Sequence, residues 1–321
     1  MRLLHPDPAA GLLGLRAMKT IVTAGGAMGP SQRAVMEAAK KVILRLDVDI
    51  DSLTPVTPAE LAAGFPSPEL RQQFINGALV ISLADGPPAR ETVAKIAAFA
   101  EALGVDTSAV NDLRRLAEHH MLIFKIDFLR RSQIADIMKN QLEQHGPLGL
   151  VKSVLTMRGV MEDPALARRY RAWEELPEDT LGHSLVAFYA KNGFSLPGER
   201  KGFPEAGLYH DLCHVLGGYG VDPEGEVQVA SFSSGFMRHR PIYIVLFSVL
   251  IFSAGINVRP SKEDFVTTGV LGKPGMAERM FTAMERGAQV NQDLSDKWDY
   301  WAYAALPLDE ARRRLNVVPK S

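Results

Sequence analysis

The sequence predicts an all-α protein made of two helical domains. Apolar residues recur at helical spacing in many segments, while few segments show the alternation of apolar and polar residues that is typical of strands. At 321 residues, the chain is long enough for two domains that each bury a core. We expect an N-terminal extension at residues 1–17, a helical domain at 18–120, a connecting helix at 121–150 and a larger helical domain at 151–321.

The composition excludes one class of function. A net charge of −1 lacks the strongly basic footprint of a nucleic-acid-binding domain, so we expect no nucleic-acid partner. Cys213 is the single cysteine, so no internal disulfide can form and a reducing compartment is expected. We therefore predict a cytoplasmic protein, and we leave open a peripheral contact with the inner membrane.

The sequence of the N-terminal part predicts a frayed start followed by a helical unit that occurs twice. Residues 1–17 have only short apolar runs broken by prolines, unlike the continuous apolar core of a secretory signal. Helical spacing then predicts amphipathic helices around Val35–Leu46 and Val93–Leu103. The lead-ins V-T-A-G-G-A-M-G-P-S-Q-R at 22–33 and I-S-L-A-D-G-P-P-A-R-E at 81–91 are similar, which indicates an internal duplication with a period of roughly 57 to 58 residues.

The second lead-in places Asp85 before a glycine and Glu91 early in the next helix. This pattern resembles the TerB-like domains, a small all-helical family named for tellurite resistance proteins, over about Met18–His120. The resemblance implies a cation held by Asp85 and Glu91, although the first copy has glycines where an acidic turn is expected. The alternative is that Asp85 forms a turn and Glu91 favours a helix N-terminus, in an interaction or stability module.

The next segments are helical as well. Asn111–Gln144 mixes apolar and basic residues at helical spacing, and the His-Gly-Pro sequence at His145–Pro147 ends the pattern. We expect this stretch to pack between the domains, and its alternative is contact with an anionic membrane surface. A further helical stretch covers Met161–Trp173.

The most apolar run, Ile242–Ile256, is shorter than the roughly 20 residues that a membrane-spanning helix needs, so it predicts a buried core helix. Near the C-terminus, Leu306–Pro319 predicts a short helix with acidic residues first and Arg312–Arg314 last, an order that matches the helix dipole.

Candidate metal ligands gather between Tyr209 and Glu226. If 209–216 is helical, then His210, Asp211 and His214 point into one arc of about 100°. A glycine cluster stops that helix, and a turn can bring Glu226 back to the same face. Two imidazoles and two carboxylates suit zinc, iron(II) or manganese(II). The alternative is a solvated His-Asp pair, a core histidine and a helix-capping glutamate.

The H-D-x-x-H-x11-E spacing of these residues resembles that of the fourth protein of the Coq series, a family of ubiquinone (coenzyme Q) biosynthesis proteins. The resemblance covers Val151–Pro319, and Leu176–Gly182 and Leu306–Val317 are similar to the first and last motifs of the family. It implies an all-helical fold and a metal held by His210, Asp211, His214 and Glu226. Cys213 occupies a position that is not a ligand in the family, so we expect it to pack.

The resemblance further implies an enzyme that removes the ring carboxyl group of a polyprenylated hydroxybenzoate with oxidation at the same carbon. The four ligands would then be catalytic. A polyprenylated aromatic quinone precursor and other quinone-biosynthesis proteins are the expected partners, and we expect a homo-oligomer. Because zinc has no accessible redox step, a redox-capable ion is favoured in the active form.

Two other functions remain open. One is a non-catalytic scaffold that binds prenyl-lipid intermediates and organises quinone-biosynthesis enzymes. The other is an H-D phosphohydrolase site, which would need His183 together with Asp293 or Asp296. In addition, Arg238 and Arg240 could receive an aromatic carboxylate while Ile242–Ile256 lines a path for an isoprenoid tail, or they could be solvated at a helix start.

Overall fold

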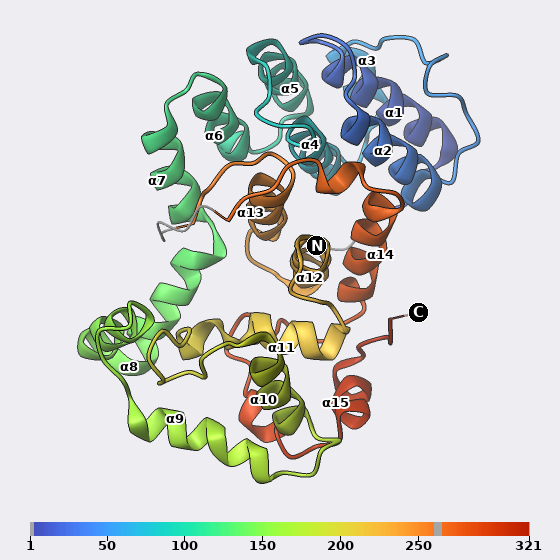
Figure 1. The fold of residues 1–321 in the computed structure, drawn as a ribbon. Helices are drawn as coiled ribbons and strands as arrows, with labels where there is room; N and C mark the ends of the chain where they lie inside the picture. The colour runs from blue at the N-terminus through green and yellow to red at the C-terminus, as the bar shows by residue number, and fades with distance from the viewer. Residues whose placement is uncertain (1–2, 260–264, 321) are drawn as a thin grey trace.

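A computed structural model describes residues 3–259 and 265–320, and over these ranges the chain is all-helical, as predicted (Figure 1). Fifteen α-helices and no β-strand form within the described ranges, where two isolated bridges pair Thr180 with Pro307 and Ala254 with Thr268. The α-helices are α1 (Pro8–Val22), α2 (Pro30–Ala38), α3 (Pro58–Gly64), α4 (Pro68–Ser82), α5 (Arg90–Leu103), α6 (Ser108–Ala117), α7 (Met121–Arg131), α8 (Gln133–Met157), α9 (Pro164–Arg171), α10 (Leu181–Asn192), α11 (Leu208–Gly217), α12 (Pro223–Phe236), α13 (Ile242–Phe252), α14 (Met276–Ala288) and α15 (Leu308–Leu315). Short π or 3-10 turns are η1 (Ala39–Leu44), η2 (Ala172–Glu175), η3 (Glu205–Gly207), η4 (Val270–Gly272) and η5 (Tyr300–Tyr303).

The first helix belongs to the core. Asp7 caps α1 by accepting hydrogen bonds from the next two free backbone N–H groups at 2.9 and 3.0 Å, and Pro8 takes the first helical position. Leu15 and Ile21 of α1 are buried, and α1 packs on α3 and α4. The prediction of a frayed extension at residues 1–17 is therefore wrong from residue 8 onward, because α1 crosses that boundary and forms one wall of the N-terminal bundle.

The N-terminal bundle contains a structural repeat, but its period differs from the predicted one. The order helix, glycine turn, helix occurs as α1–α2 and again as α4–α5. Gly26 and Gly86 occupy the same place in the two turns, with φ of 139° and 134°, a region that only glycine adopts readily. These glycines, like the starts of α2 and α5, are 60 positions apart. The π turn η1 after α2 distorts the helical spacing from which the shorter period was inferred.

Asp85 serves as a helix cap between the two copies. Its two carboxylate oxygens accept hydrogen bonds from the backbone N–H groups of Ser31 and Gln32 at the start of α2, both at 2.9 Å. Glu91 is exposed in the first turn of α5. No cluster of three potential metal ligands in the described part of the chain contains either residue. The structure thus agrees with the turn-and-cap alternative for these two acidic residues.

The predicted connecting helix, 121–150, is broken. α6 ends before His119, whose φ is 62°, and α7 ends where Ser132 begins α8 by accepting a hydrogen bond from a backbone N–H. Gly146, with φ of 68°, breaks the helical geometry of α8 at the predicted His-Gly-Pro stop. Helical structure nevertheless resumes at once and continues to Met157, because proline is tolerated in the first turn of a new helical segment.

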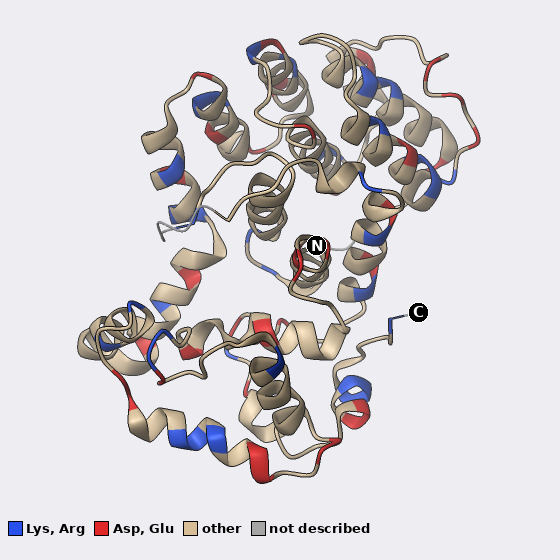
Figure 2. Cartoon of the chain, in the orientation of Figure 1, with Lys and Arg blue, Asp and Glu red and all other residues tan. Residues whose placement is uncertain are grey.

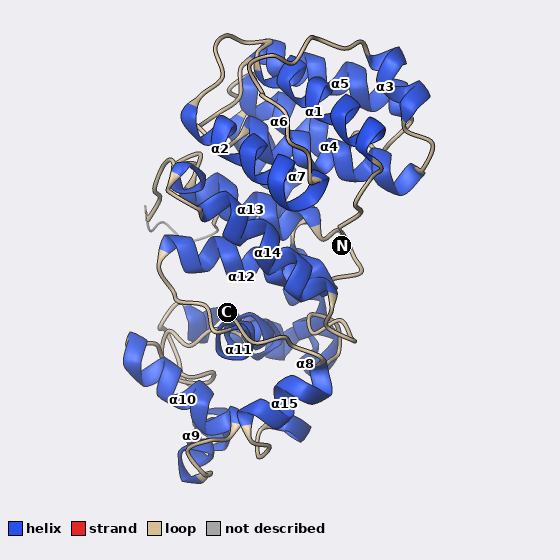
Figure 3. Cartoon of the chain, turned by 90° about the vertical axis from the view of Figure 1, so that its right-hand side faces the viewer, coloured by secondary structure: helices blue, strands red, loops and turns tan. Residues whose placement is uncertain are grey.

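The two predicted domains share one core. α13 packs on α4, and α14 packs on α2 and η1, so elements from both halves meet. Figures 1 and 3 show α12, α13 and α14 between the N-terminal bundle and a second group formed by α8 to α11 and α15. The buried apolar residues of the described ranges, except Ala167, form one contiguous cluster from Leu3 to Val317. The boundary near residue 150 is therefore not marked by separate cores.

The centre of this core is α13. Ten of its eleven residues are buried, which confirms the predicted buried helix, and Figure 2 shows that it carries no charged residue. Beside it, α12 and α14 approach backbone to backbone: a Cβ on Gly287 would lie 1.8 Å from the carbonyl oxygen of Phe232. Glycine is thus required at that crossing. Among the described helices, none combines the length and apolarity that a membrane crossing requires.

Candidate metal centre

The candidate centre is built by α11 and the start of α12. α11 stops where Gly218 adopts a left-handed φ of 71°. The turn that follows is tight, because a Cβ on Gly225 would lie 2.0 Å from the carbonyl oxygen of Gly220. Asp222 then caps α12 by accepting two backbone hydrogen bonds at 3.0 Å each. This turn returns Glu226 to the face of α11, as the glycine pattern predicts.

The C-terminal end of α11 is held by two arginines from distant segments. Arg312 of α15 donates to the carbonyl oxygens of Leu216 and Val215 at 3.0 and 3.2 Å, and Arg286 of α14 donates to that of Gly217 at 3.1 Å. These carbonyl groups have no partner inside the helix, and positive charge is favoured at this end of the helix dipole. The ligand-bearing helix is therefore fixed against the C-terminal part of the chain.

The structure brings three of the four predicted ligands, His210, Asp211 and His214, into one group, and it places Glu226 beside the two histidines. The Nε2 atoms of His210 and His214 are 3.3 Å apart, and each lies 3.5 Å from one carboxylate oxygen of Glu226. Asp211 joins the two histidines in a group whose ligand atoms all lie within 4.8 Å of one another. In the described part of the chain, this His-Asp-His group is the one cluster that could hold a metal ion.

The spacing of these donors fits a small divalent ion. Ligand atoms bound at roughly 2.0–2.1 Å in a tetrahedron stand about 3.3–3.4 Å apart. The Nε2 atoms of His210 and His214 are 3.3 Å apart, close to this value, and each lies 3.5 Å from a different oxygen of Glu226, Oε2 for His210 and Oε1 for His214. The side chains of His210 and Glu226 keep 29% and 25% of their exposure while that of His214 keeps 1%, so one side of the centre faces solvent. An accessible side is a feature of catalytic metal sites, whereas structural sites are closed.

Neighbouring groups orient the donors. The Nδ1 atom of His214 lies 3.3 Å from the carbonyl oxygen of Tyr219, so an Nδ1–H there leaves Nε2 free to bind an ion. Phe188 stacks on the His214 ring, with ring centroids 5.5 Å apart. The Tyr189 hydroxyl donates a hydrogen bond to the Asp211 carboxylate. Such outer contacts fix the direction in which ligand atoms point.

The donors also perturb one another electrostatically. Burial lowers the pKa of His214, and the adjacent His210 lowers it further. Burial raises the pKa of Asp211. Burial would also raise the pKa of Glu226, but the hydrogen bond with His210 and the charge of His210 outweigh it, so the pKa lies below its usual value. A neutral imidazole at His214 and an ionised carboxylate at Glu226 are the forms that bind a metal ion.

The other candidate residues take different roles. Cys213 is fully buried and stands outside the donor group, as a packing residue would. The Nδ1 atom of His183 lies 3.1 Å from a backbone carbonyl oxygen, and Asp293 accepts hydrogen bonds from two backbone N–H groups. Neither these two residues nor Asp296 joins a ligand cluster in the described ranges, so the ligand set of an H-D phosphohydrolase is not formed there.

Arg238 and Arg240 lie away from the donor group. Arg238 follows α12 at the end opposite to Glu226, twelve residues along the chain. At a rise of about 1.5 Å per helical residue, this separation is roughly 18 Å. A carboxylate at the metal centre therefore cannot also rest on these arginines, and both arginines are exposed, in agreement with the alternative that they are solvated.

Three orienting residues were not predicted from the sequence: Phe188, Tyr189 and Tyr219. Tyr219 sits inside the glycine cluster that was read as a helix stop, and its contribution is a backbone carbonyl that any residue could supply. Phe188 and Tyr189 come from α10, a helix that the sequence analysis does not predict. Two adjacent aromatic residues in a helix do not indicate a metal centre in the sequence. Their role becomes visible only when the structure shows that α10 packs on α11.

The chain matches no family model and no curated protein sequence. What the centre can do follows from its donors. Two imidazoles and two carboxylates favour zinc, iron(II) or manganese(II), and the absence of a thiolate disfavours a structural zinc site of the cysteine-rich kind. The centre is thus suited to bind a divalent ion and to leave one side accessible to a ligand.

We predict that the purified protein holds near-stoichiometric divalent metal and that His214→Ala loses most of it, because removing one of four donors commonly breaks such a site. The measurement is elemental analysis of both proteins. His183→Ala is the matched control, since His183 is another partly buried histidine outside the donor group, and it should keep its metal. Equal metal content in parent and His214→Ala would contradict the assignment.

Proposed function

We propose that this chain is a metal-dependent enzyme of ubiquinone biosynthesis, which removes the ring carboxyl group of a polyprenylated hydroxybenzoate with oxidation at the same carbon. The observation that carries the proposal is the placement of the His210, His214 and Glu226 donors 3.3 to 3.5 Å apart with one accessible side. The spacing of these residues in the sequence is also the most specific part of the resemblance to the Coq family.

A divalent ion held by these donors would supply a positive charge for the ring carboxylate, and iron or manganese would add the redox step that zinc lacks. The protein residues have separate tasks. Burial, and the nearby Asp211 charge, raise the pKa of Tyr189 well above its usual value, so Tyr189 keeps its proton and donates a hydrogen bond to Asp211. Phe188 covers the buried His214 ring from behind and excludes water there. Substrate would enter from the side on which His210 and Glu226 are exposed.

Replacement of the carboxyl group by a hydroxyl group releases carbon dioxide and takes two electrons from the ring. Dioxygen is the proposed oxidant, because no residue of the centre is a redox group: water supplies the hydroxyl oxygen, and dioxygen takes up the two electrons with two protons and leaves as hydrogen peroxide. A polyprenylated aromatic precursor is thus the proposed substrate, and other quinone-biosynthesis proteins are the proposed partners.

A second candidate function is a scaffold that binds prenyl-lipid intermediates and gathers other enzymes. It is favoured by the exposed apolar surface of α7 and α8. Of fourteen exposed large hydrophobic residues in the described ranges, ten lie between Met121 and Val160. Leu148, beside the kink in α8, is 86% exposed and Leu122 is 72% exposed. Apolar exposure this concentrated marks a contact with a partner or a membrane.

The two functions differ in what the donors do. In a strain that lacks its own version of this step, the parent gene should restore quinone, while His210→Ala should accumulate the ring-carboxylated precursor because the reacting centre has lost a donor. Quinone and precursor are measured by mass spectrometry of lipid extracts. If His210→Ala restores quinone as well as the parent does, the catalytic function fails and the scaffold function takes its place.

Arg130 and Lys139 are exposed among the apolar residues of α7 and α8, and Lys125 is half-buried. Each exposed cation has a carboxylate nearby, Asp127 at 2.9 Å and Glu143 at 3.8 Å, so the apolar side chains would supply most of the contact with an anionic bilayer. We predict that the protein sediments with vesicles containing anionic lipid and that Leu122→Asp with Leu148→Asp abolishes this. Ala94→Asp with Ala98→Asp, on the exposed face of α5, adds equal charge elsewhere and should leave sedimentation unchanged. If neither the parent nor the control variant binds the vesicles, the proposed membrane contact is ruled out.

A further inference from the structure

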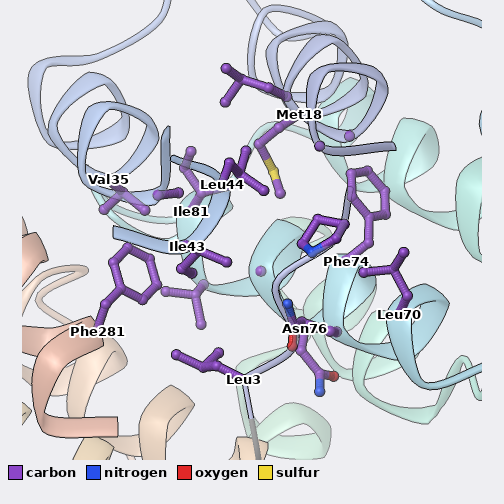
Figure 4. A pocket seen from close by; sticks show the side chains of 18 of the residues that line it. Leu3, Met18, Val35, Ile43, Leu44, Leu70, Phe74, Asn76, Ile81 and Phe281 are labelled. Atoms are coloured by element: carbon purple, nitrogen blue, oxygen red, sulfur yellow. The ribbon is translucent and has the colours of Figure 1, made fainter. Parts of the chain in front are cut away.

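A second candidate binding site lies where the N-terminal bundle meets α13 and α14. A cavity of about 120 Å³ is lined there by residues of α1, α2, η1, α4, α13 and α14. Figure 4 shows Met18, Val35, Leu44, Phe74 and Phe281 around it. Of the residues that line it, all are apolar or glycine except Gln73 and Asn76. It stands apart from the metal centre, since no residue of the donor group lines it.

The cavity stays open although two of the glycines that line it could carry a methyl side chain without a steric clash. Gly11 of α1 and Gly77 of α4 both line the cavity. A Cβ at either position would meet no atom closer than 3.5 and 3.4 Å respectively, so alanine fits at both. Glycine inside a helix is less favourable than alanine, and packing does not require it here. The two glycines therefore keep open a cavity that larger residues would close.

The size and polarity of the cavity define what it can hold. An apolar cavity of about 150 Å³ stays dry and takes up a ligand of six carbons such as benzene. The space here is slightly smaller and equally apolar, so it suits a hydrocarbon segment of about five or six carbons. Its polar neighbour Gln73 is already satisfied: its side chain exchanges two hydrogen bonds with the backbone of Leu4, at 2.7 and 2.8 Å.

A wider trough of about 610 Å³ adjoins the cavity and shares Gln73, Asn76 and Ile242 with it. Arg238 and Arg240 line this trough, and both are exposed.

Among the described residues, no carboxylate forms an ion pair with the guanidinium group of either Arg238 or Arg240. A third arginine on the trough, Arg131, is already engaged by Asp112 at 2.5 Å. The carboxylates of Glu69 and Asp106, also in the trough, accept hydrogen bonds from Ser67 and Ser108 hydroxyls. Arg238 and Arg240 are therefore the charged donors that remain for a ligand.

We propose that the cavity and trough form a binding site for a single-chain amphiphile with an anionic head. The end of the hydrocarbon chain fills the cavity, the rest of the chain follows the trough past Ile242, and a carboxylate or phosphate head rests on Arg238 and Arg240. Arginine suits either head, because its fork of N–H groups matches both anions. The site is independent of the metal centre, and its ligand is separate from the substrate proposed above.

The test is calorimetric titration of the full chain with decanoate, decyl phosphate and decanol. The parent should bind both anions saturably at one site, with decanol bound at least tenfold more weakly. Arg238→Gln with Arg240→Gln should weaken the anions at least tenfold and leave decanol unchanged. Arg90→Gln with Lys95→Gln, which removes the same charge from α5, should change nothing. If decanoate binds more tightly than decyl phosphate, the natural ligand has a carboxylate head; if decyl phosphate binds more tightly, it has a phosphate head.

The cavity is tested by chain length. Gly77→Leu adds four carbons to its lining and should shift the preferred fatty anion from decanoate toward hexanoate, while Gly77→Ala shifts it less. A shortened optimum also shows that the variant is folded. His210→Ala should bind decanoate as the parent does, so failure of the metal centre and failure of this site are distinguishable. Absence of saturable binding to the parent, or an unchanged chain-length optimum in Gly77→Leu, overturns the proposal.

Discussion

The interaction on which the site depends is the approach of one carboxylate, that of Glu226, to two imidazoles from another helix. His210 and His214 are placed by a single helical turn of α11, and local geometry alone brings them together. Glu226 faces them at 3.5 Å only because the chain reverses between α11 and α12. That reversal needs a left-handed Gly218 and a contact between Gly220 and Gly225 that leaves no room for a Cβ. The position of Glu226 beside the two histidines therefore depends on the backbone conformation at three glycines, Gly218, Gly220 and Gly225.

The rest of the fold holds that geometry from both sides. α12 carries Glu226 at its start and is locked to α14 by the close crossing at Gly287, which a side chain would prevent. Arg286 of α14 and Arg312 of α15 also donate hydrogen bonds to carbonyl groups at the C-terminal end of α11 that have no partner inside the helix. Since α13 and α14 in turn pack on α2, α4 and η1, the N-terminal bundle supports the centre. This explains physically why the chain has one continuous core.

Local patterns in the sequence were sufficient for the helical class, for the buried α13 and for the donor set on α11, because each depends on spacing within one segment. Contacts between segments were not predictable in the same way. The role of Asp85 depends on α2 lying beside it, and Tyr189 becomes relevant only where α10 meets α11. The extension at 1–17 was misjudged because its prolines mark a helix start, with Asp7 as the cap. The single connecting helix predicted at 121–150 is wrong because α7 ends at Arg131 and the helical geometry breaks again at Gly146, and the first of these breaks does not interrupt the apolar pattern of the sequence.

The central claim is that the α11 and α12 donors form one centre for a divalent ion. It is tested most directly by X-ray absorption spectroscopy at the metal edge of the loaded, full-length protein. The account predicts a first shell of nitrogen and oxygen atoms at about 2.0–2.1 Å that includes two imidazole rings, with no sulfur scatterer near about 2.3 Å. In the fraction of metal that His210→Ala retains, one imidazole should be absent from this shell. A sulfur ligand, or a shell without imidazole in the parent, would contradict the account.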